Sequence, residues 1–295
     1  MYKKISGTAR TLRYRYHKSL PPALYPWALA RLYKRAIGQE LNLKHPRTFT
    51  EKMQWVKLYD HNPLKTQLAD KYLVREWIID RIGEKYLIPL LGVWDSFDEI
   101  DFDLLPNQFV LKANHASGMN IIVTDKSRLD MYDAKEKFDK WLKINHAYIS
   151  FELHYRNIVP KIIAEEYLRF NVNEPEDYKF ICFDGEPKYC WIDVNRYTDH
   201  RRNVYDMNWR LQEWQLNNYK HTDNPVPKPL NFELMIELTK KLASGFSHVR
   251  VDWYNLQGRI YFSEMTFTST SGFARIYPSK YDVLLGDMWK LPINK

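Results

Sequence analysis

The sequence predicts an α+β fold with mainly antiparallel sheets, and two observations support this prediction. The first third of the chain has a helix-capping pattern and apolar residues at mixed helical spacing, whereas short runs rich in β-branched and aromatic residues follow from about residue 86 onward. Short polar turns separate many of these runs. Strands joined in this way pair antiparallel, because parallel pairing needs a long crossover connection.

Helices are expected mainly in the N-terminal part of the chain. Thr48 and Glu51 have the spacing of a capping box, which predicts a helix start at this point. A second helix is expected over 63–82, with Pro63 in its first turn and Gly83 at its end. Two later helices are expected over 134–144 and 232–242.

Strands are expected where β-prone runs lie between turn residues. Neither an internal repeat nor a Gly/Ser-rich linker divides these runs, so composition does not mark sharp domain boundaries. The predicted strands cover 86–91, 109–112, 121–123, 162–170, 178–183, 188–194, 249–254 and 259–267.

Composition places the chain among globular proteins. Its 295 residues are 45% hydrophobic and 27% charged, which allows one to three domains with an ample core. The chain lacks the roughly 20 consecutive apolar residues that a membrane span requires, and its N-terminus lacks the pattern of a secretory signal. We therefore expect a cytoplasmic protein. The two cysteines, Cys182 and Cys190, are expected to be free, buried thiols.

Positive charge is concentrated near the N-terminus. Residues 1–50 contain eleven Lys or Arg and a single acidic residue, whereas the whole chain has a net charge of +8. The remainder is therefore slightly acidic. Residues 1–50 are expected to contact the inner face of a membrane peripherally or to bind an anionic substrate, and the alternative is a solvated basic surface.

A hairpin near the C-terminus contains two acidic residues inside β-prone runs. A three-residue loop over 256–258 would place Arg250 opposite Glu264 and Asp252 opposite Phe262. Residues of one face then include Arg250, Asp252, Glu264 and Thr266, and the other, core-facing set is Val249, Val251, Trp253, Tyr261 and Met265.

This register makes Asp252 and Glu264 diagonal neighbours, about 7 Å apart at the backbone, so both carboxylates could reach one hard cation. A Mg²⁺ ion would remove their mutual repulsion, and Arg250 could help to hold a phosphoryl group. The alternative is that Arg250 and Glu264 form a cross-strand salt bridge and Asp252 faces water.

A candidate phosphate loop lies between the strands predicted over 109–112 and 121–123. Ser117 and Gly118 allow the loop to present backbone N–H groups to a phosphate, and Lys112 at the end of the first strand adds a positive charge. The loop is not a Walker motif, because the glycine and lysine spacing is absent and a strand follows it. His115 in the same loop is expected to have no catalytic role.

These motifs occur in an order that resembles the ATP-grasp superfamily, and the chain looks most like its TupA-like branch, named for a teichuronopeptide biosynthesis protein and associated with bacterial surface-polysaccharide loci. The likeness spans about residues 40–290 and is carried collectively by Asp70, Lys71 and Arg75, by Lys112, and by the segments 46–55, 163–168, 177–180, 249–252 and 264–266. The resemblance implies a nucleotide held between two α+β subdomains, with ATP and Mg²⁺ as cofactors.

The resemblance also implies roles for individual residues. Lys71 and Lys112 would contact the phosphates and loop 116–120, with Ser117 and Gly118, would close over them, while Arg250 would steady the reacting group together with Lys112. The strand end with Glu165, Glu166, Tyr167 and Leu168 would hold the adenine, Asp177 or Glu176 the ribose, and Lys179 would belong to the same nucleotide site. Asp252 and Glu264 would bind magnesium, with Thr266 where the superfamily usually has Asn.

The implied activity is that of an ATP-grasp carboxylate–amine ligase that forms an acyl phosphate. Its expected partners are an amine-bearing small molecule and an anionic polysaccharide, or a precursor of one, which Arg201, Arg202 and Arg275 are candidates to bind. The expected division of the chain is a basic helical region over 1–62, a linking part over 63–108, a small subdomain with the phosphate loop over 109–170 and a C-terminal subdomain with the magnesium site over 171–295.

Three alternatives remain open at this point. Asp101 and Asp103 form the DxD pattern of sugar-nucleotide glycosyltransferases, although an acidic surface loop explains it equally well. A phosphotransferase could use the same nucleotide site. A nucleic-acid-binding protein would use residues 1–50, with Tyr14, Tyr16, Tyr25 and Trp27 as stacking surfaces, and we expect no such partner.

Overall fold

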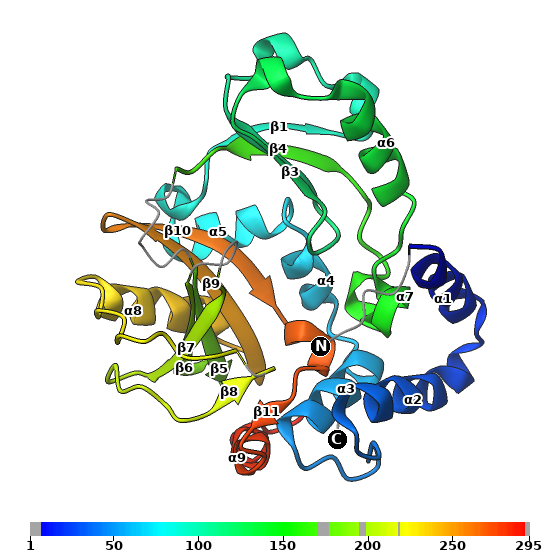
Figure 1. Ribbon diagram of the computed structural model, residues 1–295, viewed down its shortest axis with the longest axis vertical. Coiled ribbons are helices and arrows are strands. Elements are labelled where there is room, and N and C mark those ends of the chain that lie inside the picture. The colour runs from blue at the N-terminus through cyan, green and yellow to red at the C-terminus, as the bar shows by residue number, and fades with distance from the viewer. Residues whose placement is uncertain (1–6, 170–176, 195–198, 218, 293–295) are drawn as a thin grey trace.

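Two separate sheets organise the computed structural model, which describes residues 7–169, 177–194, 199–217 and 219–292. In Figure 1 a four-stranded sheet with helix α6 (Met131–Trp141) lies at the top, a five-stranded sheet with helix α8 (Phe232–Ala243) lies below it, and helices from the N-terminal part of the chain line the lower right. Helices and antiparallel sheets are thus combined, as expected for an α+β fold. Within the described residues, every helix is too short or too polar to cross a membrane.

The N-terminal region is helical, as predicted. Its third helix begins at the predicted capping box: the Thr48 hydroxyl accepts from the Glu51 N–H at 3.2 Å, and the Glu51 carboxylate accepts from the Thr48 N–H at 3.1 Å. Leu29 and Tyr33 of the second helix are fully buried. The three helices are α1 (Gly7–Ser19), α2 (Tyr25–Ile37) and α3 (Phe49–Tyr59).

The single helix predicted over 63–82 is wrong, because the structure has two helices there, α4 (Pro63–Ala69) and α5 (Val74–Ile82). Between them, the buried carboxylate of Asp70 accepts from the backbone N–H groups of Tyr72 and Leu73 at 2.8 and 3.2 Å. An aspartate that binds nearby N–H groups in this way competes with helical hydrogen bonds. The break places Lys71 in a turn.

The four-stranded sheet is antiparallel, with strand order β1-β4-β2-β3. Helix α6 (Met131–Trp141) contributes the buried Phe138 to the core against this sheet. The short elements α7 (Ala147–Ser150) and η6 (Leu153–Tyr155) precede the return of the chain into the sheet. The strands are β1 (Leu90–Trp94), β2 (Phe109–Ala113), β3 (Asn120–Val123) and β4 (Ile162–Glu166), so the first begins later than the 86–91 predicted.

The five-stranded sheet is antiparallel, with strand order β10-β9-β5-β6-β7. Helix α8 (Phe232–Ala243) covers one face, and α3 with α9 (Lys280–Met288) packs against part of the other. A small two-stranded sheet joins β8 (Gln215–Leu216) to β11 (Ile276–Tyr277). The five strands are β5 (Asp177–Phe183), β6 (Glu186–Val194), β7 (Arg201–Asp206), β9 (His248–Leu256) and β10 (Arg259–Thr266).

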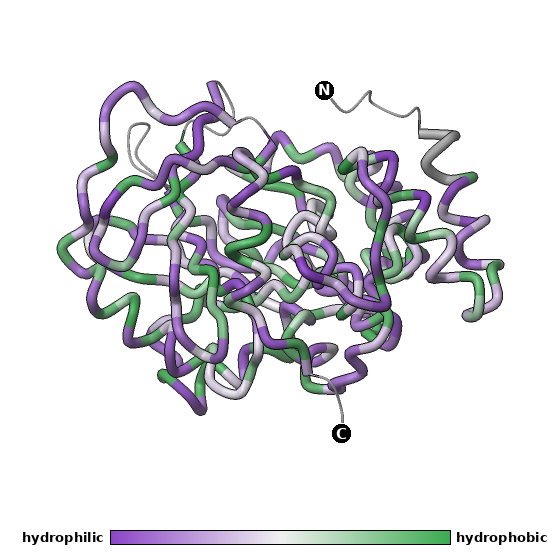
Figure 2. Tube along the Cα trace, turned by 90° about the horizontal axis from the view of Figure 1, so that it is seen from below, coloured by the Kyte–Doolittle hydropathy of each residue, from purple (hydrophilic) through white to green (hydrophobic). Residues whose placement is uncertain are grey.

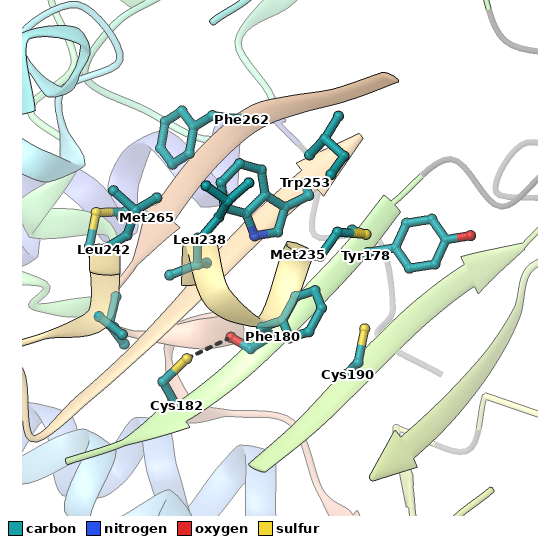
Figure 3. Packing of buried hydrophobic residues seen from close by; sticks show 14 of the residues in the cluster. Tyr178, Phe180, Cys182, Cys190, Met235, Leu238, Leu242, Trp253, Phe262 and Met265 are labelled. Atoms are coloured by element: carbon teal, nitrogen blue, oxygen red, sulfur yellow. Dashed lines mark hydrogen bonds between the residues drawn. The ribbon is translucent and has the colours of Figure 1, made fainter. Parts of the chain in front are cut away.

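Figure 3 shows the core between α8 and the five-stranded sheet, where Trp253 and Phe262 lie near Leu238 and Leu242. Both cysteines face this core as free thiols, which confirms the sequence-based prediction. Their burial raises the pKa of each thiol well above its usual value, so neither is an activated nucleophile.

The predicted three-residue loop of the C-terminal hairpin is wrong. Leu256 pairs directly with Arg259, so the loop consists of Gln257 and Gly258 alone. Both loop residues have positive φ angles, 50° and 88°, as the tightest hairpin turns require.

The predicted cross-strand pairs are also wrong, because a β-bulge lies between Phe262 and Glu264. The extra residue changes which positions of β10 face the core: Ile260 and Phe262 do so before the bulge and Met265 after it, whereas Tyr261 does not join that core. Asp252 and Glu264 are therefore directly opposite rather than diagonal. The observed pairs are Phe262 with Trp253, Glu264 with Asp252 and Thr266 with Arg250.

Candidate active site

A cavity of about 970 Å³ is lined by residues of both large sheets and of the segments that connect them. The four-stranded sheet contributes Lys112 and Glu165, and the five-stranded sheet contributes Asp252 and Glu264. The predicted phosphate loop over 116–120 and the predicted acidic pair thus line one space, although Asn120 and Asp252 are 132 positions apart in the chain. The fold therefore brings them together.

On the wall formed by the four-stranded sheet, Glu165 of β4 holds two cations. Its carboxylate accepts from the Lys112 ammonium at 2.5 Å and from the Arg75 guanidinium at 3.3 Å. Arg75 also donates to the Ile88 carbonyl at 3.0 Å. Lys112 and Arg75 are thus fixed at the cavity wall, where an incoming phosphate could take the place of Glu165 as their partner.

Lys71 lies on the same wall and touches the predicted phosphate loop. Its ammonium donates to the Ala116 carbonyl at 2.6 Å, and burial lowers its pKa. Ser117 and Gly118 form the exposed tip of the loop and line the cavity. Gly118 has a φ of 72°, a left-handed conformation that side chains other than glycine rarely adopt. Lys71 and this loop could therefore bind a triphosphate through a positive charge and backbone N–H groups.

The predicted adenine-binding segment divides at the end of β4. The backbone of Glu165 and Glu166 pairs with β2, and Glu166 N–H also donates to the Pro89 carbonyl at 3.0 Å, so the ladder already uses these groups. Tyr167 and Leu168 follow the strand and line the cavity, and their contact with the adenine stays a prediction. Glu176, one of the two predicted ribose partners, lies outside the described residues.

Across the cavity, Arg250 lies between the two acidic side chains of the hairpin. Its guanidinium donates to both carboxylate oxygens of Asp252 at 2.7 Å and to Oε1 of Glu264 at 2.8 Å. It also donates to the hydroxyls of Thr266 at 3.1 Å and Ser269 at 3.2 Å. Arg250 thus compensates the repulsion between the carboxylates, and the isolated Arg250–Glu264 salt bridge considered from the sequence is part of a larger network.

The two carboxylates differ in proton affinity. Burial raises the pKa of Asp252 to about 6 against the attraction of Arg250. Burial also opposes ionisation of Glu264, but the charges of Arg250 and Lys71 outweigh it and lower the pKa of Glu264 to about 2. Glu264 is the more accessible of the two, since 34% of its side chain is exposed against 2% for Asp252. Glu264 is therefore ionised and within reach of a ligand in the cavity.

The donor set fits a Mg²⁺ ion. Asp252, Glu264 and Thr266 present oxygen atoms to one cavity, and within the described part of the chain Oε2 of Glu264 accepts no hydrogen bond. Among the residues placed by the structure there is no cluster of three or more His, Cys, Asp or Glu that could hold a metal by itself. Mg²⁺ is commonly bound by one or two carboxylates together with substrate phosphates, and this site offers that arrangement.

A second charged network lies beside the acidic pair on β5, β6 and β7. The Asp193 carboxylate is held by the Arg202 guanidinium at 2.6 and 3.0 Å, and Lys179 bridges Asp177 at 2.8 Å and Asp193 at 3.2 Å. Burial opposes ionisation of Asp193, but the hydrogen bond from His200 and the nearby cations hold its pKa well below the usual range. The predicted residues Asp177, Lys179 and Arg202 therefore share the cavity wall with Asp193.

Several predicted residues do not reach the cavity. Arg201 bonds Asp199 at 2.7 Å, and Arg275 donates to the Ala36 carbonyl at 2.9 Å. Neither residue lines the cavity, and binding of the anionic substrate by either one stays a prediction. The aspartates of the DxD pattern lie in an exposed turn, where the Asp101 carboxylate accepts from the Asp103 N–H at 3.0 Å.

Sequence reasoning assigned no role at the site to two groups of residues, although Asp70 contributed to the family resemblance. Asp70 fixes the phosphate loop by accepting from the Asn114 side chain at 2.9 Å, and Asp193 anchors Arg202. The other group is Glu152 with Thr268, Thr270 and Ser271, which line the cavity. A run of small polar residues directly after the strand that carries Glu264 was a signal for this second group, whereas the Asp70 and Asp193 contacts depend on long-range packing.

A family model described as TupA-like ATPgrasp matches residues 51–290. The chain belongs to the TupA-like ATP-grasp family. The fold of this TupA-like protein, with two α+β parts around a shared cavity, is therefore the ATP-grasp fold. No curated protein matches the chain closely enough to count as a relative.

Solved structures similar to the TupA-like chain are ATP-grasp proteins. D-alanine–D-alanine ligase from Bacillus anthracis, complexed with ATP, is 14% identical, with 74% of this chain and 57% of that chain covered and a TM-score of 0.41. Phosphoribosylamine–glycine ligase from Thermotoga maritima is 13% identical, with coverage of 69% and 48% and a TM-score of 0.43. A RimK domain ATP-grasp protein from Sphaerobacter thermophilus is 12% identical, with coverage of 76% and 69% and a TM-score of 0.39. The TupA-like chain thus spans about half to two thirds of the length of these proteins.

Proposed function

We propose that the protein is an ATP- and Mg²⁺-dependent carboxylate–amine ligase that works through an acyl phosphate. Its proposed substrates are a uronic-acid-containing surface polysaccharide, or a precursor of one, and an amino acid, peptide or amino sugar. The observation that carries this proposal is the shared cavity, in which the cations Lys71 and Lys112 lie on one wall and Arg250, Asp252 and Glu264 on another. A polyphosphate and a second anionic substrate would each need positive charge, which Lys71 and Lys112 provide on one wall and Arg250 provides on the other.

The proposed reaction has two steps. A substrate carboxylate oxygen attacks the γ-phosphorus of ATP, the bond between this phosphorus and the β-phosphate bridging oxygen breaks, and ADP leaves. A neutral amine then attacks the acyl carbon, a C–N bond forms, and the C–O bond to phosphate breaks. Inorganic phosphate leaves, and the amine nitrogen loses a proton to solvent or to the departing phosphate.

The chain supplies positioning and charge compensation for both steps rather than a covalent nucleophile. Lys71 and Lys112 would hold the phosphates, and Arg250 would stabilise the charge that develops on the transferred phosphoryl group and on the acyl oxygen. Asp252, Glu264 and Thr266 would hold Mg²⁺, which polarises phosphate oxygens as a Lewis acid.

Trapping with hydroxylamine tests the proposal. The purified protein is incubated with ATP, Mg²⁺ and glucuronate, galacturonate or their oligomers, with and without hydroxylamine, and ADP and hydroxamate are measured. We expect ADP release that depends on the uronic acid, and a hydroxamate when hydroxylamine is present. Absence of both would reject the ligase proposal, and ADP with a phosphorylated but unactivated sugar would identify a phosphotransferase. Magnesium-dependent binding of UDP-sugars without ATP binding would instead favour the glycosyltransferase alternative.

The basic N-terminal helices support a further part of this proposal, a peripheral contact with an anionic membrane. Leu12, Tyr16, Leu24 and Trp27 are exposed apolar side chains in a region rich in Lys and Arg, and Arg31 stacks on Trp27 at 4.9 Å. Figure 2 shows these helices at one edge of the molecule with hydrophilic and hydrophobic segments interspersed. Such a mixture favours anionic lipid surfaces.

Vesicle co-sedimentation tests the membrane contact. We expect the protein to bind vesicles that contain phosphatidylglycerol, to bind neutral vesicles weakly, and to lose binding when Trp27 and Arg31 are both replaced by Ser. Equal binding of the variant and the wild type would contradict this contact. The variant is not expected to alter ATP turnover, because neither residue lines the cavity.

A further inference from the structure

One wall of the cavity has no role in the reaction proposed above. It is formed by Ser150, Glu152 and Tyr155, which follow α6, and by Thr268, Thr270 and Ser271, which follow β10. We call these six residues the Glu152 wall. Glu152 is the only acidic residue among the six, and none of them is Lys or Arg. The wall proposed to bind the nucleotide instead holds the cations Lys71 and Lys112.

The Glu152 wall is rigidly built around one buried carboxylate. Glu152 is 4% exposed, and it accepts hydrogen bonds from the hydroxyls of Thr268 at 2.5 Å, Ser271 at 2.8 Å and Ser150 at 2.9 Å. Thr270 and Ser271 hold left-handed φ angles of 50° and 54°. Side chains rarely adopt such angles unless the surroundings impose them, and strained positions of this kind gather at ligand sites.

The carboxylate of Glu152 is charged and has capacity left for a ligand. Burial disfavours its ionised form, but the charges of His146, Lys57 and His154 outweigh burial and lower its pKa. Oε2 accepts from two hydroxyls, whereas Oε1 accepts only from Thr268 within the described part of the chain. A carboxylate has about four acceptor sites, so one remains for a donor from the cavity.

Lys57 is a counter-ion of Glu152 within the chain, but it neutralises this carboxylate only in part. Lys57 lies behind the wall, where its ammonium donates to the Ser271 carbonyl at 3.0 Å and to Gln54 at 2.8 Å, and it does not line the cavity. Burial lowers the pKa of Lys57 to about 7, so a substantial fraction of Lys57 is neutral near neutral pH. His146 also lines the cavity, and its Nε2 lies 3.8 Å from Oε2 of Glu152. This arrangement leaves Oε1 of Glu152 as the oxygen for a cationic ligand that approaches from the cavity.

The Glu152 wall is connected to the reaction centre. Arg250 donates to Ser269, the neighbour of Thr268, at 3.2 Å. Tyr155 is also near both centres: burial raises the pKa of its phenol, and the carboxylates of Glu152 and Glu264 raise it further. A molecule on the Glu152 wall would thus lie next to the acyl group that Arg250 contacts.

We propose that the Glu152 wall is the binding site of the amine substrate, where Glu152 binds the ammonium form and the surrounding hydroxyls contact a polar body such as that of an amino sugar or an amino acid. This inference rests on the proposed ligase function. Charge separates the two substrates: the anionic donor and the nucleotide occupy the cationic wall, and the cationic acceptor occupies the anionic one. The ammonium loses its proton to solvent before the amine attacks.

The test compares two nucleophiles in the variant Glu152→Gln, which keeps the size of the side chain and removes its charge. Hydroxylamine, which is small and uncharged at neutral pH, reports acyl phosphate formation, whereas coupling to D-glucosamine, L-alanine or L-lysine reports use of the amine site. We expect the ratio of amine coupling to hydroxamate formation to fall at least about tenfold, mainly through the KM for the amine, since the substitution removes the charge that strengthens the hydrogen bond to the ammonium. The matched control is Glu136→Gln, an exposed glutamate of α6 that pairs with Lys140, and its ratio should equal that of the wild type.

The outcomes separate the two proposals. Absence of hydroxamate in the wild type overturns the ligase function and the amine site with it. Hydroxamate with an unchanged ratio in Glu152→Gln overturns the amine site alone. If Glu152→Gln does not fold, inhibition of the wild type decides the question: each active amine should bind more tightly than its deaminated analogue, D-glucose for D-glucosamine or L-lactate for L-alanine, and equal inhibition by both members of a pair overturns the amine site.

Discussion

One face of the five-stranded sheet is mainly apolar, whereas the other is apolar near one end and charged near the other. Val249, Val251 and Trp253 of β9 face the core under α8, and the intervening Arg250 and Asp252 face the cavity. On the cavity side, α3 and α9 cover only the apolar half of the sheet. The same strand therefore supplies stability through one set of residues and candidate chemistry through the next.

The comparison teaches that a β-strand can keep these two tasks apart because its side chains alternate between faces. Substitutions on the α8 face should alter the free energy of unfolding without altering turnover by the folded protein. Substitutions on the charged half of the opposite face should alter turnover. Residues that are both charged and buried are the exception, and they test the separation most severely.

Asp252→Asn should reduce both ATP turnover and stability, and it should have the largest effect. Asp252 faces the cavity, yet it is 2% exposed and holds Arg250 through two hydrogen bonds. Removing one partner of a buried ion pair typically costs about 3–5 kcal/mol, so we expect both a large loss of ATP turnover and a lower midpoint in urea unfolding. Asp103→Asn, in an exposed turn, is the control, and a wild-type unfolding midpoint for Asp252→Asn would contradict the prediction.

Glu264→Gln should change turnover much more than stability. Its side chain is one third exposed and Gln keeps its size, so the unfolding free energy should fall less than in Asp252→Asn, although the attraction between the Glu264 charge and Arg250 is lost. Turnover should fall by roughly 10²- to 10³-fold, the usual loss when one group that stabilises the charge of a transition state is removed. Ile260→Val on the same strand is the matched contrast: it should cost about 0.5–1.5 kcal/mol of stability and leave turnover by folded protein unchanged. Full turnover in Glu264→Gln would reject its assignment to magnesium.

The sequence was sufficient for the local features of the fold and for much of the candidate site. The capping box at Thr48 and the two free cysteines depend on neighbours in the chain or on simple composition, and both predictions are confirmed. The order of motifs around Lys112 and Asp252 was sufficient to indicate the family, which the matching family model confirms.

The register of the hairpin could not be predicted fully, because two features of β10 compensate each other. The loop is one residue shorter than predicted, and the bulge before Glu264 adds one residue to the strand. The two differences restore Glu264 and Thr266 to the predicted face while changing every pair. The change of apolar positions from Ile260 and Phe262 to Met265 was a signal for the bulge that the sequence contained.

Contacts between distant parts of the chain were beyond sequence reasoning. Arg202 and Arg275 look equivalent as basic residues near strands, yet Arg202 is held by Asp193 at the cavity and Arg275 is held by the Ala36 carbonyl away from it. The partners of Glu152 were equally hard to predict. Ser150 lies beside it in the chain, whereas Thr268 and Ser271 follow more than one hundred residues later. Only the folded chain determines such partners.

His248 tests how the apolar half of the cavity-side face contributes to stability. It is 1% exposed among Phe49, Phe183 and Trp289, and its Nδ1 bonds the Cys182 carbonyl at 2.8 Å. Burial lowers the pKa of His248 from 6.5 to about 3. Because the unfolded chain takes up this proton first, stability should fall as the pH drops from about 6.5 towards 3, by at most about 1.4 kcal/mol per pH unit.

Urea unfolding between pH 7 and pH 4 measures the effect of His248. We expect His248→Phe, which fits the aromatic surroundings, to reduce the slope of stability against pH relative to the wild type. His61→Phe serves as the control, because His61 is exposed and should leave the slope unchanged. An identical slope for His248→Phe and the wild type would show that this histidine is not held neutral by the fold.

Thr266→Asn should have the smallest effect and concerns the charged half alone. The Thr266 hydroxyl accepts from Arg250 at 3.1 Å and donates to Glu264 at 3.0 Å, so it supports the acidic pair but is shorter than the Asn usual at this position in the superfamily. An amide oxygen that reaches further should lower the Mg²⁺ concentration for half-maximal turnover by a few-fold, or about 0.5–1 kcal/mol at roughly 1.4 kcal/mol per factor of ten. Thr266→Val, which removes the hydroxyl, should raise that concentration. If both variants show the magnesium dependence of the wild type, residue 266 is not a ligand, and the magnesium position is defined by the two carboxylates.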